Sequence, residues 1–135
     1  MNLVSVRIIT DDVTGMADFY EAVTGVTADR QGDIFAELRT PSATLALGSS
    51  TTVALFGAGS ARAADNHTAI IEFLVEDVDA EYVRLGERLD TVVTEPTTMP
   101  WGNRSLMFRD PDGNLVNLFT PVTAAAEAKF ARRDR

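Results

Sequence analysis

Apolar and polar positions follow a pattern that occurs twice along the chain, about 65 residues apart. Residues 3–10 form a run rich in valine and isoleucine that is typical of a β-strand, and residues 68–75 repeat it. An aspartate follows each run, Asp12 in the first copy and Asp77 in the second, where a helix N-cap is expected. The repetition indicates a duplicated supersecondary unit.

A stretch with helical spacing follows each aspartate, although Thr14 is an alternative cap in the first copy. The apolar faces consist of Met16, Phe19, Tyr20 and Val23 in the first stretch, and of Val78, Tyr82, Leu85 and Leu89 in the second. Gly25 stands where a left-handed residue commonly ends a helix. The spacing places Phe19, Tyr20 and Tyr82 in the core rather than in a binding site.

Short extended segments follow each predicted helix. They cover residues 26–31, 33–39 and 43–48, with a further piece at 52–56, and then residues 91–95, 103–109 and 114–120. The last two are joined by residues 110–113, Asp-Pro-Asp-Gly, which suit a type I turn. The order is therefore βαβββ twice, which predicts an α+β fold. Two tandem modules would form a curved eight-stranded mixed sheet around a concave cavity, with a C-terminal helix in addition.

The predicted organisation is a single domain over residues 1–122. Module one covers about 1–56, a connector of small, weakly patterned residues covers 57–67, and module two covers about 68–122. Residues 123–135 form an alanine-rich tail with high helix propensity.

Composition restricts the possible partners and compartments. The net charge of −8 argues against nucleic acid as a partner, because phosphate contacts need clustered Lys and Arg. No apolar run reaches membrane-spanning length, and no signal peptide pattern opens the chain, so a cytoplasmic location without membrane association is expected. The absence of cysteine excludes disulfides and thiolate metal ligands.

Several motifs carry a family resemblance. They are Asp12-Val13 with Phe19-Tyr20, the Phe-Leu-Val-Glu-Asp-Val-Asp-Ala run at 73–80, Pro100-Trp101-Gly102, and the Phe-Arg-Asp-Pro-Asp-Gly-Asn run at 108–114. With these motifs, the chain resembles the vicinal oxygen chelate superfamily, which includes glyoxalase I, bleomycin-resistance proteins and extradiol dioxygenases. The resemblance spans roughly residues 3–121.

The resemblance implies four positions where members with a catalytic metal place His, Glu or Gln. These positions hold Ser5, Ala46, Ile70 and Asn117. None of these side chains supplies the imidazole or carboxylate that a divalent transition metal needs. His67, the single histidine, lies in the connector three residues before Ile70 and is expected to be a solvated loop residue. We therefore expect neither the family's metal site nor another cofactor.

Strand alternation predicts which side chains line the cavity. In the first strand Val4, Val6 and Ile8 would face the helix, and Ser5, Arg7 and Ile9 would face the cavity. Arg7 and Glu72 then occupy equivalent places in the two modules. One hypothesis is an ion pair between them on the cavity floor, and the alternative is a polar junction contact without any role in ligand binding.

The same alternation places Phe35, Glu37 and Arg39 in the cavity. In the last hairpin, Arg104, Leu106 and Phe108 are predicted to pair with Phe119, Asn117 and Leu115, respectively. Trp101 is either a stacking platform at the rim or a packing residue at a loop or dimer seam. The predicted ligand-binding set is Arg7, Phe35, Glu37, Glu72, Trp101, Arg104, Phe108 and Asn117.

The favoured function is the binding of a small organic molecule in the concave sheet cavity without the usual metal site, as the resemblance to bleomycin-resistance proteins implies; no catalytic residue is required for it. A planar or cationic ligand suits the aromatic and acidic residues, and a homodimer would cover the open sheet. The alternative is a lyase, isomerase or dioxygenase that uses an atypical metal site or metal-free acid–base catalysis by Glu37 or Glu72. A third possibility is a structural or regulatory partner module. No Ser-His-Asp triad, P-loop or dinucleotide fingerprint supports another chemistry.

Overall fold

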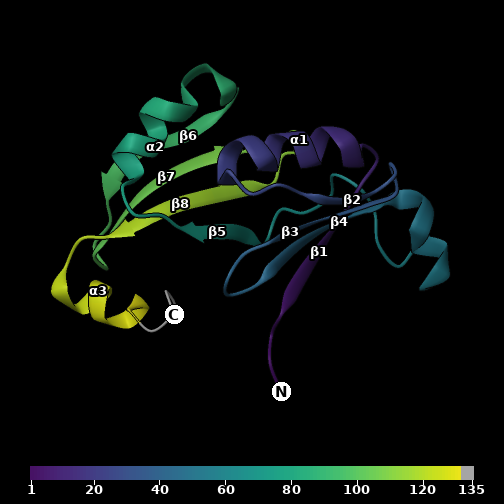
Figure 1. Cartoon of the computed structure of the whole chain (residues 1–135), viewed down its shortest axis with the longest axis horizontal. Coiled ribbons are helices and arrows are strands. Elements are labelled where there is room, and N and C mark those ends of the chain that lie inside the picture. The colour runs from purple at the N-terminus through teal and green to yellow at the C-terminus, as the bar shows by residue number, and fades with distance from the viewer. Residues whose placement is uncertain (132–135) are drawn as a thin grey trace. The chain divides into compact units, whose positions relative to one another are not determined.

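The computed structural model describes residues 1–131, and its internal contacts divide the chain into two compact units. The first half comprises Met1–Asn66 and the second half begins at His67. Each half contains one mixed four-stranded sheet and a helix that follows its first strand (Figure 1). The predicted α+β class and the repeated βαβββ order are confirmed. Residues 132–135 of the predicted tail lie outside the described residues.

The first half has a central strand that is paired on both sides. Its elements are β1 (Ser5–Thr10), α1 (Val13–Thr24), β2 (Asp29–Gln31), β3 (Phe35–Arg39), β4 (Thr44–Ser49) and the 3-10 helix η1 (Ser50–Leu55). The strand order is β1-β4-β3-β2, with β1 parallel to β4 and the other pairs antiparallel. A parallel pair needs a crossover connection, which α1 and the β2–β3 hairpin supply.

The second half repeats this arrangement. Its elements are β5 (Ile70–Leu74), α2 (Val78–Leu85), the 3-10 helix η2 (Gly86–Arg88), β6 (Val92–Thr98), β7 (Asn103–Arg109), β8 (Leu115–Pro121) and α3 (Ala124–Phe130). The strand order β5-β8-β7-β6 is that of the first sheet, with β5 parallel to β8. The duplication read from the sequence is therefore present at the level of strand topology.

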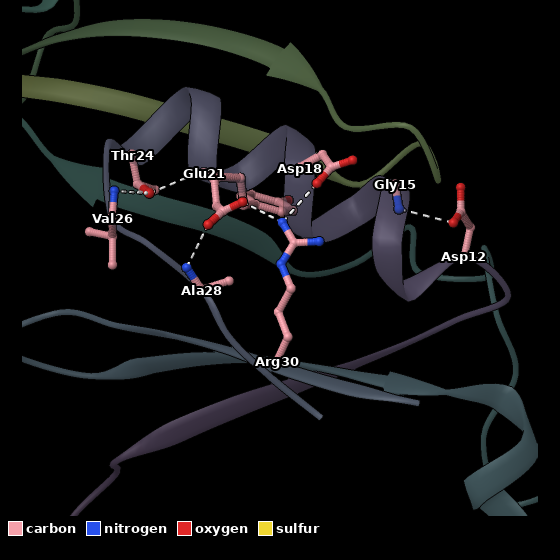
Figure 2. Close-up of polar contacts among 9 residues, drawn as sticks. Asp12, Gly15, Asp18, Glu21, Thr24, Val26, Ala28 and Arg30 are labelled. Atoms are coloured by element: carbon pink, nitrogen blue, oxygen red, sulfur yellow. Dashed lines mark hydrogen bonds and ion pairs between the residues drawn. The ribbon is translucent and has the colours of Figure 1, made fainter. Parts of the chain in front are cut away.

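Helix α1 begins and ends at the residues that the sequence indicated. The Asp12 side chain accepts a hydrogen bond from the Gly15 amide at 2.9 Å (Figure 2). Gly25 at the C-cap has φ +71°. The buried face of α1 includes Met16, Tyr20 and Val23 and packs against β3 and β4. Asp77 caps α2 in the same way, accepting from the Ala80 amide at 3.1 Å.

The segment after α1 is less extended than predicted. Thr24 Oγ1 accepts from the Val26 amide at 3.1 Å, and the Glu21 carboxylate accepts from the Ala28 amide at 2.8 Å (Figure 2). Because helix side chains take these two backbone donors, the donors do not join a strand ladder, and β2 begins only at residue 29. The predicted strand at residues 26–31 is therefore correct only for its last three residues.

The Glu21 carboxylate also pairs with Arg30, which in addition contacts Asp18 at 2.7 Å and so ties β2 to α1. The Ala28 amide and the Arg30 guanidinium hold the pKa of Glu21 below its ordinary value of 4.5. A lowered folded-state pKa contributes stability above the unfolded-state pKa, and this stability is lost as pH falls through the folded-state value.

We therefore expect Glu21→Gln to lower the melting temperature at neutral pH, with a difference from the unmodified protein that shrinks below about pH 5. Thermal unfolding followed by circular dichroism between neutral and acid pH measures this difference. Glu87→Gln, at an exposed position in η2, is the matched control and should show no such trend. A Glu21→Gln deficit that is constant with pH would contradict the assignment.

The predicted extended piece at residues 52–56 is wrong. Ser49 ends β4 and caps η1, because its side chain accepts a hydrogen bond from the Thr51 amide at 3.2 Å. The Thr52 hydroxyl donates to the Ser49 carbonyl at 2.7 Å. These local bonds from hydroxyl side chains favour a tight turn over a continued strand.

The hairpin between β7 and β8 determines which face each of its side chains occupies. The Gly113 amide donates to the Asp110 carbonyl, Gly113 has φ +85°, and the Asp110 amide donates to the Asn114 carbonyl. This is a three-residue loop, a type I turn followed by a left-handed glycine. It pairs Arg104 with Thr120 and Phe108 with Val116. The predicted pairing of Arg104 with Phe119, Leu106 with Asn117 and Phe108 with Leu115 is therefore wrong by one residue.

The prediction that helix α1 covers Val4 and Val6 is wrong. They are 60% and 53% exposed, respectively. Val6 pairs with Leu45 and so points to the helix side of the sheet, but α1 packs on β3 and β4.

Over residues 1–131 no helix is long and apolar enough to cross a membrane.

Candidate ligand-binding surface

The face of the first sheet that points away from α1 is called its open face. The Arg30 side chain contacts helix α1, and Arg30 pairs with Ala36 in the sheet. Ala36 and Leu38, which lie on the same side of β3 and are buried, therefore point toward α1. Residues that alternate with these point the other way. The open face therefore carries Ser5, Arg7 and Ile9 from β1, Thr44, Ala46 and Gly48 from β4, and Phe35, Glu37 and Arg39 from β3. The predicted placement of Arg7, Phe35 and Glu37 away from the helix is confirmed.

The Arg7 side chain lies between two aromatic rings. Its guanidinium carbon is 5.2 Å from the centroid of the Phe35 ring and 5.2 Å from that of the Phe56 ring. Each contact stabilises the cation by about 0.5–1 kcal/mol at an exposed site. Within the first half, no carboxylate forms an ion pair with Arg7. Sequence reasoning missed Phe56, because it assigned this residue to an extended piece rather than to the end of η1.

Glu37 differs from Arg7 because its charge is already compensated. Arg39 contacts Glu37 at 3.2 Å and also contacts Asp29 of β2 at 3.2 Å. Glu37 is therefore part of a small ion-pair network on the open face. The Glu37 carboxylate is thus already engaged by Arg39, whereas Arg7 has no acidic partner in this half.

The second sheet has an open face of its own, on the side away from α2. Thr120 accepts from the Val78 amide at the start of α2, so residues paired with Thr120 or in phase with it point to the helix. Glu72, Asn117 and Met107 lie in the opposite phase and are paired across β5, β8 and β7. The predicted placement of Glu72 and Asn117 on one surface is confirmed.

Glu72 and Asn117 form a direct hydrogen bond on this open face. Asn117 Nδ2 donates to Glu72 Oε2 at 2.8 Å, and the reverse orientation of the amide would set two acceptors against each other. Asn117 is only 7% exposed, and its Oδ1 is buried and accepts no hydrogen bond from residues 1–131. A buried acceptor without a donor costs about 1–3 kcal/mol, so such an atom requires an explanation. Glu72 itself is exposed.

Two residues of the predicted ligand-binding set lie on the other side of this sheet. Phe108 is completely buried, and Arg104 forms a bidentate pair with Asp79 of α2 at 2.8 and 3.0 Å. The Arg104 guanidinium keeps the pKa of the Asp79 carboxyl below its ordinary value. Arg104 and Phe108 therefore join the helix to the sheet and do not belong to the open face. The one-residue error in the hairpin register caused both misplacements.

The remaining predicted residues lie in loops. Trp101, in the turn between β6 and β7, is 67% exposed and is accessible to a ligand or a partner, so both of its predicted roles stay open. His67 is exposed in the connector, as expected. The Arg7–Glu72 ion pair stays a prediction. Within the first half, Arg7 contacts Phe35 and Phe56. Within the second half, Glu72 accepts a hydrogen bond from Asn117.

A cavity that the sequence did not indicate lies in the second half beside α3. Its volume is about 660 Å3, and its walls include Leu74, Glu76, Glu127 and Phe130. Phe130 stacks edge-on against Phe119 of β8, with ring centroids 5.0 Å apart. Sequence reasoning treated α3 as an accessory helix, and only the position of Phe130 at its end could have indicated this packing.

The sequence profile of the Glyoxalase/Bleomycin resistance protein/Dioxygenase superfamily matches residues 2–118. The chain belongs to this superfamily. None of the curated proteins matches the chain. Among solved structures, a conserved domain protein is 29% identical with a TM-score of 0.71, and the match covers 90% of this chain and 99% of that one.

Two further solved structures show the same fold as this glyoxalase-superfamily chain. A glyoxalase/bleomycin resistance protein/dioxygenase family enzyme from Burkholderia phytofirmans PsJN is 19% identical with a TM-score of 0.78, covering 90% of this chain and 100% of that one. A lactoylglutathione lyase from Agrobacterium tumefaciens is 21% identical with a TM-score of 0.65, covering 87% and 92% of the two chains.

The four positions at which the resemblance implies metal ligands lie on the open faces of the two sheets. In this superfamily member, Ser5 and Ala46 lie on the open face of the first sheet, and Ile70 and Asn117 lie on that of the second. A hydroxyl, a methyl, an alkyl chain and a single amide supply no imidazole or carboxylate, so the four side chains together do not fit a divalent transition metal. Over residues 1–131, no three His, Cys, Asp or Glu side chains are grouped so that they could hold a metal ion.

Proposed function

We propose that this superfamily member binds a small organic molecule on the open face of its second sheet, through Glu72 and Asn117. The observation that carries the proposal is the buried Oδ1 of Asn117, which accepts no hydrogen bond from residues 1–131 and lies beside the exposed carboxylate of Glu72. Together these two side chains offer mainly hydrogen-bond acceptors, because one N–H of Asn117 Nδ2 already donates to Glu72. The pair therefore favours a ligand that donates hydrogen bonds.

A cationic donor such as an amine or amidine fits this surface best. The Glu72 carboxylate adds charge to the hydrogen bond, and a hydrogen bond to a charged group is about twice as strong as a neutral one. The net charge of −8 also favours the approach of a cation from solution. The superfamily description includes bleomycin-resistance proteins, for which binding alone would suffice. Homodimer formation and a cytoplasmic location stay predictions.

The binding prediction is tested with benzamidine, a planar cation with several N–H donors. We expect it to raise the melting temperature, because a ligand that prefers the folded state stabilises that state. Glu72→Gln should weaken binding by about 10- to 100-fold, which corresponds to a charged hydrogen bond of about 1.5–3 kcal/mol. Isothermal titration calorimetry measures the affinity.

Glu87→Gln, at an exposed position away from this face, is the matched control and should bind benzamidine like the unmodified protein. Equal binding by the Glu72→Gln variant would contradict the proposal. The alternative of metal-free acid–base catalysis by Glu72 predicts a further result. A bound compound would be recovered chemically changed, and Glu72→Gln would abolish that change.

A further inference from the structure

Arg7 lies on the open face of the first sheet and, unlike Arg39, has no acidic partner within that half. Its guanidinium lies 5.2 Å from each of two ring centroids, those of Phe35 and Phe56. Aromatic rings stabilise the charge but do not use its N–H donors as a carboxylate does. Since no carboxylate of the first half pairs with Arg7, these donors are available to an anion from solution.

The surroundings of Arg7 favour an apolar body attached to that anion. Arg7 pairs with Ala46 of β4, and the position where a Gly48 Cβ would lie is 3.4 Å from both Arg7 Cδ and Ile9 Cδ1. The sheet beneath Arg7 therefore consists of small side chains, with Ile9 beside it. Phe56, which is 66% exposed, can contact a ligand on its outer side.

The acid nearest to this site in the sheet does not compete for Arg7. Glu37 pairs with Ala46 from the opposite side, so it is two strands away from Arg7 on the same face. Its carboxylate is engaged by Arg39 at 3.2 Å. Arg39 thus provides a natural comparison: it is an arginine on the same face with two acidic partners, whereas Arg7 has aromatic partners.

We propose that Arg7, held between Phe35 and Phe56, is a binding site for the carboxylate of an aromatic or otherwise planar organic acid. The planar guanidinium can donate two parallel hydrogen bonds to one carboxylate. The two rings restrict the side chain beforehand, so that less conformational freedom is lost on binding. The proposal does not rest on the Glu72–Asn117 site, because Arg7 belongs to the first half and selects the opposite charge.

The experiment titrates the full chain, labelled with 15N, with sodium benzoate and follows the Arg7 Nε–Hε signal by NMR. Benzoate is expected to shift this signal and to saturate, whereas benzamide, its neutral analogue, should bind at least about 10-fold more weakly if charge drives recognition. Arg7→Gln should weaken benzoate binding by about 10-fold or more. Arg7→Lys should recover part of the affinity, because the charge returns without the planar fork.

Two further variants control for position and folding. Arg39→Gln, on the same face, should leave benzoate affinity unchanged, and Phe56→Leu should weaken it at an exposed position that does not threaten the fold. Circular dichroism confirms that each variant is folded. Benzoate binding that is equal in Arg7→Gln, equal affinity for benzamide, or no benzoate binding would each overturn the proposal. Benzamidine binding is measured separately, so either proposal can fail without the other.

Discussion

Phe108→Ala is expected to lower the free energy of unfolding by about 3–5 kcal/mol, because it removes a large side chain from a packed core. Phe108 is completely buried between the second sheet and α2, with Leu106 and Val116 equally buried beside it. A loss of this size is a substantial part of the stability of a typical domain, about 5–15 kcal/mol. Urea unfolding followed by fluorescence or circular dichroism measures it.

Trp101→Ala is the matched control, since it removes a larger aromatic side chain from the same half at a position that is 67% exposed. Its effect on stability should stay within about 0.5 kcal/mol. Phe108→Leu, which retains most of the apolar volume, keeps the fold for binding measurements and should leave benzamidine affinity unchanged. Loss of ligand affinity with full stability would instead support the sequence-based placement of Phe108 in the binding site.

Asp110→Ala is expected to lower the free energy of unfolding by about 2–4 kcal/mol, because it leaves buried donors without an acceptor. Asp110 is 4% exposed. Its Oδ1 accepts from the Asp112 and Asn114 amides at 2.9 Å, and its Oδ2 accepts from Asn114 Nδ2 at 2.7 Å. These three bonds hold the loop that sets the β7–β8 register. Thermal and urea unfolding measure the loss.

Asp33→Ala, in the exposed turn between β2 and β3, is the control for removing a loop aspartate and should change stability by less than about 0.5 kcal/mol. Asp110→Asn is a finer test, because it keeps the shape but turns one acceptor into a donor. The free energy of unfolding of Asp110→Asn should lie between those of Asp110→Ala and Asp33→Ala. An Asp110→Ala variant as stable as Asp33→Ala would show that the carboxylate does not hold the loop.

Comparison of the two sheets shows where strand alternation succeeds and where it fails as a predictor. In the first sheet the placement of Phe35 and Glu37 was right, because the alternation could be anchored on the buried Ala36 and Leu38. In the last hairpin the turn was recognised but its length was underestimated by one residue. Since side chains alternate with a period of two, that single residue moved Arg104 and Phe108 to the opposite face.

The sequence by itself determined what depends on local spacing. The duplicated βαβββ order, the Asp12 and Asp77 caps and the Gly25 helix end all follow from short-range chemistry. The superfamily resemblance likewise rested on short motifs, and the profile match over residues 2–118 confirmed it.

Only the tertiary structure decided which distant side chains meet. Phe56 reaches Arg7 across 49 positions of sequence because β4 ends in a 3-10 turn beside β1, and Asn117 meets Glu72 because β5 and β8 pair in parallel. Such contacts depend on strand register and loop length. A one-residue change in loop length moves the side chains of a strand to the opposite face, while the local sequence pattern stays the same.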